Sequence, residues 1–202
     1  VGELDVDFLA FSVHKMMGPS GVGVLYGKYD LLKSLGRYNV GGDTISNTYL
    51  DKSPEYLPPP MKFEAGLQDY AGMIAAGAAC DFLNKVGRRD IDLYEMELNE
   101  YISDKLGKHE EIGIIGPKNP RERSGICTFF IKKPTRLDHK EKMLDERLSD
   151  RYNIMIRSGM FCVNGWFNQK LKEGKINRIW FPAFRASFYL YNTKEEIDLF
   201  IT

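Results

Sequence analysis

The sequence predicts an α/β fold that ends in a smaller α+β unit. Two observations predict it. The first 90 residues place an apolar strand, a Gly/Pro-rich turn and a second apolar strand ahead of a long helical stretch. The remaining residues alternate strand candidates with amphipathic helices, which is typical of an α+β arrangement. We therefore expect two domains, residues 1–90 and residues 91–202.

The first domain is expected to hold two strands, a short helix, a long connection and a long helix. Unbroken apolar runs indicate the strands, which we expect to be buried, and apolar residues at helical spacing indicate the long helix. Cys80 falls within that helix, where core packing is the expected role. The expected ranges are strands at 8–11 and 22–26, helices at 28–35 and 70–86, and a connection at 37–62.

The second domain is expected to begin with a helix over 90–107, capped by Asp90. Cys127 lies in an expected strand, where we again expect core packing. The other expected elements are strands at 112–115, 125–131, 153–157, 178–180 and 186–191 and helices at 138–152 and 194–201.

Charge and cysteine usage narrow the class of protein. The 28 basic residues balance the 28 acidic residues, and no basic run predicts a nucleic-acid partner. No apolar run approaches the ~20 residues that cross a bilayer, and no signal-peptide pattern is present. The three cysteines are widely spaced and odd in number, so neither a zinc site nor a disulfide framework is expected. We expect a cytoplasmic protein with reduced thiols.

A lysine stands at an unusual place directly after the first strand. Lys15 follows Ser12 and His14 and precedes a Gly/Pro-rich turn. Burial disfavours a charged ammonium, and a neutral lysine amine forms a Schiff base with an aldehyde. A hydroxyl and an imidazole at this spacing suit a phosphate. Pyridoxal phosphate carries both an aldehyde and a phosphate, although a lysine at a strand end is more often simply solvated.

The surrounding residues resemble the cofactor-lysine segment of the class V aminotransferase family, in its cysteine desulfurase and selenocysteine lyase branch. The resemblance implies that Lys15 is the Schiff-base lysine and that Ser12 and His14 also bind pyridoxal phosphate. It also implies a fold type I enzyme, of which this chain resembles the C-terminal half: the end of the large-domain mixed sheet and the small C-terminal domain. The matching string is Ser12-Val-His14-Lys15-Met-Met-Gly18-Pro19-Ser-Gly21-Val-Gly23.

A second cluster resembles the family signature Arg-Ser/Thr-Gly-His-His-Cys. Arg157 and Cys162 stand at its ends, but Met160 and Phe161 replace its two histidines. The resemblance implies that Arg157 binds the substrate carboxylate, a task that suits a planar guanidinium. It implies that Cys162 is the catalytic sulfur acceptor, since a thiolate attacks the substrate sulfur. The alternative is that Cys162 is a small buried hydrophobic residue.

Two further segments match the family. Arg185 lies in a run similar to the family's Arg-Ala-Ser strand, which implies that it is the better supported clamp for the substrate carboxylate. Gly66 closes a Phe-Glu-x-Gly segment that reaches the cofactor phosphate of the neighbouring subunit in the family. Here Leu67 replaces the threonine of that segment, so only the backbone N–H of Gly66 is left for the contact.

The resemblance implies a pyridoxal-phosphate-dependent cysteine desulfurase or selenocysteine lyase. Such an enzyme removes sulfur from L-cysteine to give alanine through an enzyme persulfide, in sulfur metabolism and iron–sulfur cluster assembly. The expected partners are cysteine or selenocysteine, a second copy of the chain and a sulfur-acceptor protein, with no metal. Two alternatives are another class V enzyme, such as an aminotransferase or lyase, and a non-catalytic half-domain that acts as a structural partner.

Overall fold

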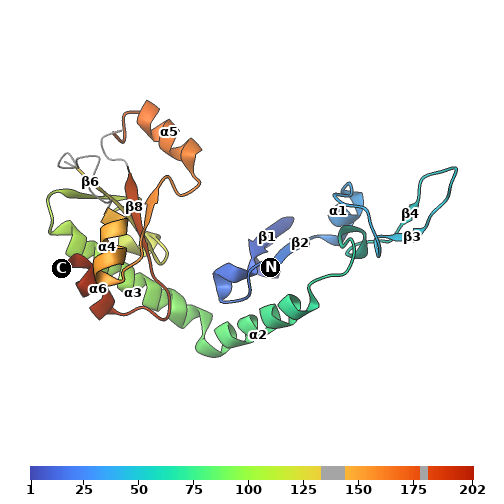
Figure 1. Cartoon of the computed structure of the whole chain (residues 1–202), viewed down its shortest axis with the longest axis horizontal. Coiled ribbons are helices and arrows are strands. Elements are labelled where there is room, and N and C mark those ends of the chain that lie inside the picture. Colours follow the sequence, from blue (N-terminus) through green and yellow to red (C-terminus); the bar gives the residue numbers. More distant parts are fainter. Residues whose placement is uncertain (133–143, 178–181) are drawn as a thin grey trace. The chain divides into compact units, whose positions relative to one another are not determined.

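The chain divides into two units, Val1–Val86 and Gly87–Thr202, in the computed structural model (Figure 1). The structure describes residues 1–132, 144–177 and 182–202. The expected strand at 178–180 and the first part of the expected helix at 138–152 lie outside the described residues.

An antiparallel hairpin opens the first unit. It consists of β1 (Phe8–Ser12) and β2 (Gly23–Gly27), paired so that Phe8 faces Gly27 and Ser12 faces Gly23. The prediction of two strands is confirmed, but the prediction that they are buried is wrong. Phe8 and Phe11 are each 41% exposed and Leu25 is 54% exposed. The reason is that β1 and β2 form a two-stranded sheet, and a sheet buries a face only where a second layer covers it.

The short helix α1 (Tyr29–Ser34) follows as predicted, and a distant lysine completes its C-terminus. The Lys62 side chain is buried, and its Nζ donates to the carbonyl oxygens of Lys33 and Leu35 at 2.8 and 2.9 Å. The last carbonyls of a helix lack partners within the helix and carry partial negative charge. A cation there satisfies them, which explains how an ammonium group is tolerated in a buried position.

The stretch expected as a connection over 37–62 contains secondary structure, so that prediction is wrong. It folds into an arm of β3 (Ile45–Asn47) and β4 (Glu55–Tyr56), followed by the 3₁₀ turn η3 (Met61–Phe63). The Tyr49 hydroxyl donates to Glu55 Oε1 at 2.7 Å and accepts from Asn47 Nδ2 at 2.8 Å. Strands of two and three residues are too short for an alternating pattern to be recognised, and these side-chain bonds stabilise the arm instead.

The long helix α2 (Tyr70–Val86) has the predicted bounds. Asp69 caps it, because its Oδ1 accepts from the N–H of Gly72 at 2.9 Å. A Cβ at Gly72 would lie 2.4 Å from Val22 Cγ2, so the glycine permits a close approach of this helix to the β1–β2 hairpin.

The second unit is a four-stranded antiparallel sheet with helices around it, and its strand order is β5-β6-β8-β7. The sheet pairs β6 with β8 so that Thr128 faces Arg185, and β7 with β8 so that Arg157 faces Arg185. Its elements in chain order are α3 (Arg88–Gly107), β5 (Ile112–Ile115), η4 (Pro120–Glu122), β6 (Ile126–Ile131), α4 (Leu144–Tyr152), β7 (Arg157–Gly159), α5 (Asn164–Lys172), β8 (Ala183–Ser187) and α6 (Lys194–Ile201).

Several of these bounds correct the sequence predictions. The strand expected over 153–157 is β7, which begins where that range ends, and the strand expected over 186–191 is β8, which begins three residues earlier. Helix α5 was not predicted. Asp90 was expected to cap α3 but lies inside its first turn, with Gly87 at the N-cap. A carboxylate in the first turn still complements the positive end of the helix.

The core of the second unit lies between α3 and the sheet. The Phe129 ring stacks on Phe184 with centroids 5.6 Å apart and meets Phe200 of α6 edge-on at 5.9 Å. The buried members come from both layers, and they are Leu98, Ile102, Leu106, Cys127, Phe129, Phe184, Ala186, Phe188 and Ile197. Among the described residues, no helix is both long enough and apolar enough to cross a membrane.

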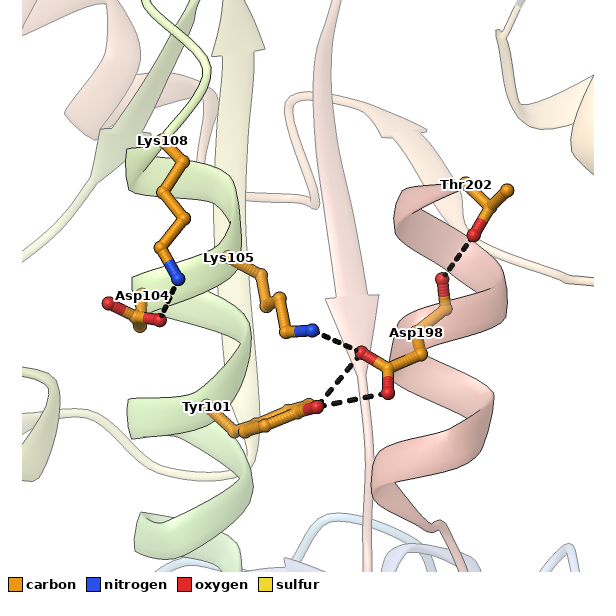
Figure 2. Close-up of polar contacts among 6 residues, drawn as sticks. All are labelled: Tyr101, Asp104, Lys105, Lys108, Asp198 and Thr202. Atoms are coloured by element: carbon orange, nitrogen blue, oxygen red, sulfur yellow. Dashed lines mark hydrogen bonds and ion pairs between the residues drawn. The ribbon is translucent and has the colours of Figure 1, made fainter.

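A polar contact fastens the C-terminal helix α6 to α3 (Figure 2). Lys105 Nζ lies 2.7 Å from Asp198 Oδ1, and the Tyr101 hydroxyl donates to both carboxylate oxygens at 2.9 and 3.0 Å. These partners hold the pKa of Asp198 below its usual range and raise that of Lys105. A depressed carboxylate pKa stabilises the fold above the unfolded-state pKa, and that stabilisation is lost as the pH falls through the folded value.

We predict that Asp198→Asn lowers the thermal unfolding midpoint of this unit by a few degrees at neutral pH. The difference from the unchanged protein should shrink on acidification below about pH 4, because protonation removes the same charge. Circular dichroism melts at several pH values measure this. The matched control is Asp104→Asn, which removes only the exposed pair with Lys108 and should change little. Equal losses in both variants would contradict the prediction.

Candidate functional site

The first cluster of candidate residues lies on the turn that follows β1. Ser12 ends the strand, and His14 and Lys15 lie in the 3₁₀ turn η2 (Val13–Met16). All three side chains are exposed, so the expected burial of Lys15 is not found within this chain. Within the described ranges, no other side chain or backbone group forms a hydrogen bond or ion pair with them. A hydroxyl, an imidazole and an amine are therefore presented together and without partners.

The shape of this turn depends on Val13 and Gly18. Val13 is 1% exposed, and its N–H donates to the carbonyl of Val22 at 3.0 Å. The N–H of Gly18 donates back to the Val13 carbonyl at 3.1 Å. A Cβ at Gly18 would lie 2.2 Å from Val13 Cγ1, so no other residue fits there without displacing the buried valine. The buried valine thus fixes the turn that carries Lys15.

The candidate Gly66 is held at the base of the arm. Its N–H donates to the carbonyl of Gly42 at 2.8 Å, and its φ of 76° favours glycine. This N–H was the group expected to reach a cofactor phosphate. Because it already has a partner in this conformation, such a contact requires that hydrogen bond to open.

The second cluster lies on the edge of the four-stranded sheet, where β7 runs into the loop before α5 (Figure 1). Arg157 and Arg185 are direct cross-strand partners, so their side chains leave the same face of the sheet. Arg157 Nη2 lies 3.7 Å from Cys162 Sγ. The Cys162 side chain is exposed, so the alternative of a buried hydrophobic cysteine is wrong for this structure. The structure brings Arg157, Arg185 and Cys162 together.

The loop before α5 returns the thiol toward the strand through two left-handed residues. Phe161 and Cys162 have φ values of 53° and 64°, a region that residues other than glycine seldom adopt. The N–H of Val163 closes the turn by donating to the carbonyl of Met160 at 3.0 Å. Phe161 in turn packs on Phe167 of α5, with ring centroids 6.3 Å apart. This backbone shape is the structural reason that Sγ meets the guanidinium.

Arg185 keeps an unused hydrogen-bond donor. Its guanidinium carbon lies 5.4 Å from the centre of the Phe161 ring, on which the cation is stabilised. Its Nε is buried and has no hydrogen-bond partner among the described residues. A buried donor without a partner costs free energy unless a ligand satisfies it. A planar carboxylate suits this donor, but Nε is covered in this conformation, so the contact requires the atoms over it to move.

Sequence reasoning missed Asp145, which bonds to Ser158 of strand β7. Ser158 donates to Asp145 Oδ2 of α4 at 2.6 Å, while Asp145 Oδ1 is buried without a partner among the described residues. Ser158 alternates with Arg157 along β7, so it points to the opposite face of the sheet. The only sequence signal was a carboxylate in the middle of the helix expected over 138–152, and spacing does not connect it to Ser158.

The other two cysteines differ from each other. Cys127 is buried, as predicted, and burial raises the pKa of its thiol to about 11. Cys80 is exposed, so its expected core packing is wrong. The buried residues of α2 are Gly72, Ala79 and Leu83, and Cys80 lies outside the face that they form. In the part of the chain that the structure describes, no group of acidic, histidine and cysteine residues is arranged to hold a metal ion.

Known proteins match the chain from end to end. A cysteine desulfurase of Haloferax volcanii is 38% identical over 199 residues, which cover 98% of this chain and 43% of that protein. A probable cysteine desulfurase of Halalkalibacterium halodurans is 39% identical over 201 residues, 98% of this chain and 44% of that protein. The chain thus spans about half the length of these relatives.

Solved structures give the same result. The apo structure of a cysteine desulfurase from Thermococcus onnurineus is 30% identical, with a TM-score of 0.81, over 100% of this chain and 46% of that one. The cysteine desulfurase CsdA of Escherichia coli is 29% identical, with a TM-score of 0.79, over the same shares. This likeness confirms the predicted fold, the C-terminal half of a fold type I enzyme.

The family model for class V aminotransferases matches residues 1–200, which is nearly the whole chain. Both clusters described above lie within that match. The chain belongs to the class V aminotransferase family.

Proposed function

We propose that this protein acts as a pyridoxal-phosphate-dependent cysteine desulfurase, which takes sulfur from L-cysteine and releases alanine. The observation that carries the proposal is the arginine–cysteine cluster: an exposed thiol 3.7 Å from one guanidinium and beside a second guanidinium with an unused donor. A sulfur acceptor and a carboxylate clamp on the same loop and sheet edge suit an amino-acid substrate that carries sulfur. The relatives named cysteine desulfurase support it.

Ser12 at the end of β1, with His14 and Lys15 of the η2 turn, fits pyridoxal phosphate. The cofactor carries an aldehyde, which binds an amine, and a phosphate, which accepts hydrogen bonds from hydroxyl and imidazole groups. Lys15 offers the amine, and Ser12 and His14 offer the two donors, all exposed and without partners within the described part of the chain. When bound, the cofactor supplies an electron sink for a carbanion at the substrate Cα. Gly66 joins this set only if its bond to Gly42 opens.

Lys15 then has a second task. With the cofactor and substrate bound, the Lys15 amine would be the base that removes the proton from the substrate Cα. The same ammonium later returns a proton to carbon. Both transfers need the lysine to be held near one position, and the turn fixed by Val13 and Gly18 holds its backbone.

Arg185 binds the substrate α-carboxylate in this proposal. The unused Nε and a neighbouring Nη can donate two parallel hydrogen bonds to the two carboxylate oxygens. The Phe161 ring lies against the guanidinium and limits its freedom to turn. This clamp orients the amino acid and does not depend on the identity of its side chain.

Cys162 accepts the sulfur. Its thiolate attacks the substrate sulfur, an S–S bond forms, and the bond between the substrate sulfur and Cβ breaks. The electron pair of the broken bond stays with the carbon, which takes up a proton and leaves as alanine. The enzyme keeps the sulfur as a persulfide on Cys162. A sulfur-acceptor protein, as in iron–sulfur cluster assembly, would then remove it.

One observation favours a second candidate, another class V enzyme such as an aminotransferase or lyase. Met160 and Phe161 stand where the family signature has histidines, and such reactions need no thiol. Cys162→Ala distinguishes the two, because it abolishes sulfur transfer from cysteine in a desulfurase and spares turnover in the other enzymes. A structural half-domain without catalysis, the third alternative, would bind no cofactor.

We also propose a homodimer in the cytoplasm. The arm ends in Leu50, which is fully exposed, and an apolar side chain at the tip of a stabilised hairpin suits contact with a second copy. All three cysteines are free thiols, as is usual in a reducing compartment. Light scattering that shows only monomers at micromolar concentration in the cofactor-loaded protein would argue against the dimer.

The experiment that tests the proposed function is covalent trapping of the cofactor. After borohydride reduction of the cofactor-loaded protein, peptide mass mapping should place the adduct on Lys15. Lys15→Arg should remove both the adduct and the long-wavelength absorbance of the bound cofactor. Lys33→Arg is the matched control, since Lys33 is also an exposed lysine of this unit. An adduct on another lysine, with Lys15 unmodified, would refute the assignment.

We predict that Arg185→Lys raises KM for cysteine sharply and leaves cofactor binding unchanged. A lysine keeps the charge but loses the paired donors, and a hydrogen bond to a charged group is worth about 1.5–3 kcal/mol. Steady-state alanine formation measures this. Arg151→Lys, on the exposed surface of the same unit, serves as the control. An unchanged KM in Arg185→Lys would exclude the clamp.

A further inference from the structure

We propose that Arg157 is the counter-ion of the Cys162 thiolate and that Arg185 alone binds the substrate carboxylate. The inference rests on the proposed function, which it refines by giving the two neighbouring arginines different anions. It replaces the expectation that both arginines bind the substrate.

The contact distance is the first reason. Arg157 Nη2 lies 3.7 Å from Cys162 Sγ, which is within hydrogen-bonding range for sulfur. An opposite charge within ~4–6 Å favours the ionised form of a neighbouring group. The left-handed residues Phe161 and Cys162 place the thiol there, at a cost in backbone strain that the rest of the loop must offset.

The pairing of the two arginines is the second reason. Arg157 and Arg185 are opposite each other on antiparallel strands, and like charges in that position destabilise the sheet. An anion beside each guanidinium relieves the repulsion. The thiolate lies beside Arg157, whereas Arg185 keeps its buried Nε unused and so is left for the carboxylate.

The third reason is the set of charged groups that contact this cluster. Three of them lie within the described residues: Arg157 on β7, Arg185 on β8 and Asp145 on α4. Asp145 is bonded to Ser158, which points to the opposite face of β7, so it does not neutralise Arg157. Arg185 contacts the Phe161 ring. Among the described residues, Arg157 is the cation that contacts the thiol.

The sequence of the loop explains why Cys162 needs Arg157 as a counter-ion. The family signature has two histidines before the cysteine, and this chain has Met160 and Phe161, neither of which carries a charge. Apolar surroundings disfavour a thiolate, whose proton must leave to solvent. Arg157 supplies the positive charge that these two positions lack.

Alkylation kinetics test the inference without cofactor or substrate. The measurement uses the full chain in a Cys80→Ser background, because Cys80 is also exposed while Cys127 is buried. The Cys162 thiolate displaces iodide from iodoacetamide, so the alkylation rate at neutral pH reports the thiolate fraction. Arg157→Gln should lower this rate severalfold, because the variant loses the opposite charge beside the sulfur. Arg157→Lys should restore part of it.

Two matched variants complete the test. Arg185→Gln should leave the alkylation rate near that of the parent, and Arg151→Gln should leave it unchanged, with circular dichroism showing that each variant is folded. An unchanged rate in Arg157→Gln, or an equal loss in Arg185→Gln, would overturn the inference. Alkylation of Cys162 needs neither cofactor nor turnover, so it can contradict the role of Arg157 while the proposed function still holds. The proposed function is tested separately, by trapping the cofactor on Lys15.

Discussion

The second unit depends on the pairing of β7 with β8, which sets Arg157 directly opposite Arg185. This register brings two like charges to one face of a sheet, an arrangement that is unfavourable without anions nearby. The surrounding structure provides a favourable contact for each of the two guanidinium groups. Cys162 turns back to one guanidinium, and the Phe161 ring lies against the other. A site that attracts anions is therefore a consequence of strand register.

The buried side of the same sheet explains how that register is kept. Phe184 precedes Arg185 on β8, is buried and stacks on Phe129 of β6. Because side chains alternate along a strand, anchoring Phe184 in the core directs Arg185 to the other face. A slip by one residue would expose the phenylalanine and bury the charge. Core packing and the placement of the charged cluster are thus one constraint.

The η2 turn of the first unit is built on the same principle at a smaller scale. A single buried side chain, Val13, stands between the exposed Ser12 and His14. The close approach of Gly18 to Val13 fixes the chain reversal, and the polar groups are presented outward. In both units, a buried apolar residue fixes the position of a polar residue next to it in sequence.

The sequence by itself determined the local features of this protein. Helices α2 and α6 and strand β5 have the predicted bounds, because their apolar residues recur at helical or strand spacing over a sufficient length. The candidate site residues Lys15, Arg157, Cys162 and Arg185 were predicted from their motifs. The strands of the arm and the start of β7 were not predicted, because strands of two or three residues are too short to show an alternation of apolar and polar residues.

Tertiary structure decided which side chains are exposed and which groups they contact. Whether Cys162 was buried or exposed depended on two left-handed residues, and residues with positive φ other than glycine leave no compositional signal. The bond between Ser158 and Asp145, and the one between Gly66 and Gly42, join residues that no spacing rule connects. Most side chains of β1, and that of Cys80, are likewise exposed because no other described element covers the faces on which they lie. Sequence specifies which groups are present, whereas burial and register, which are set by long-range packing, specify their partners.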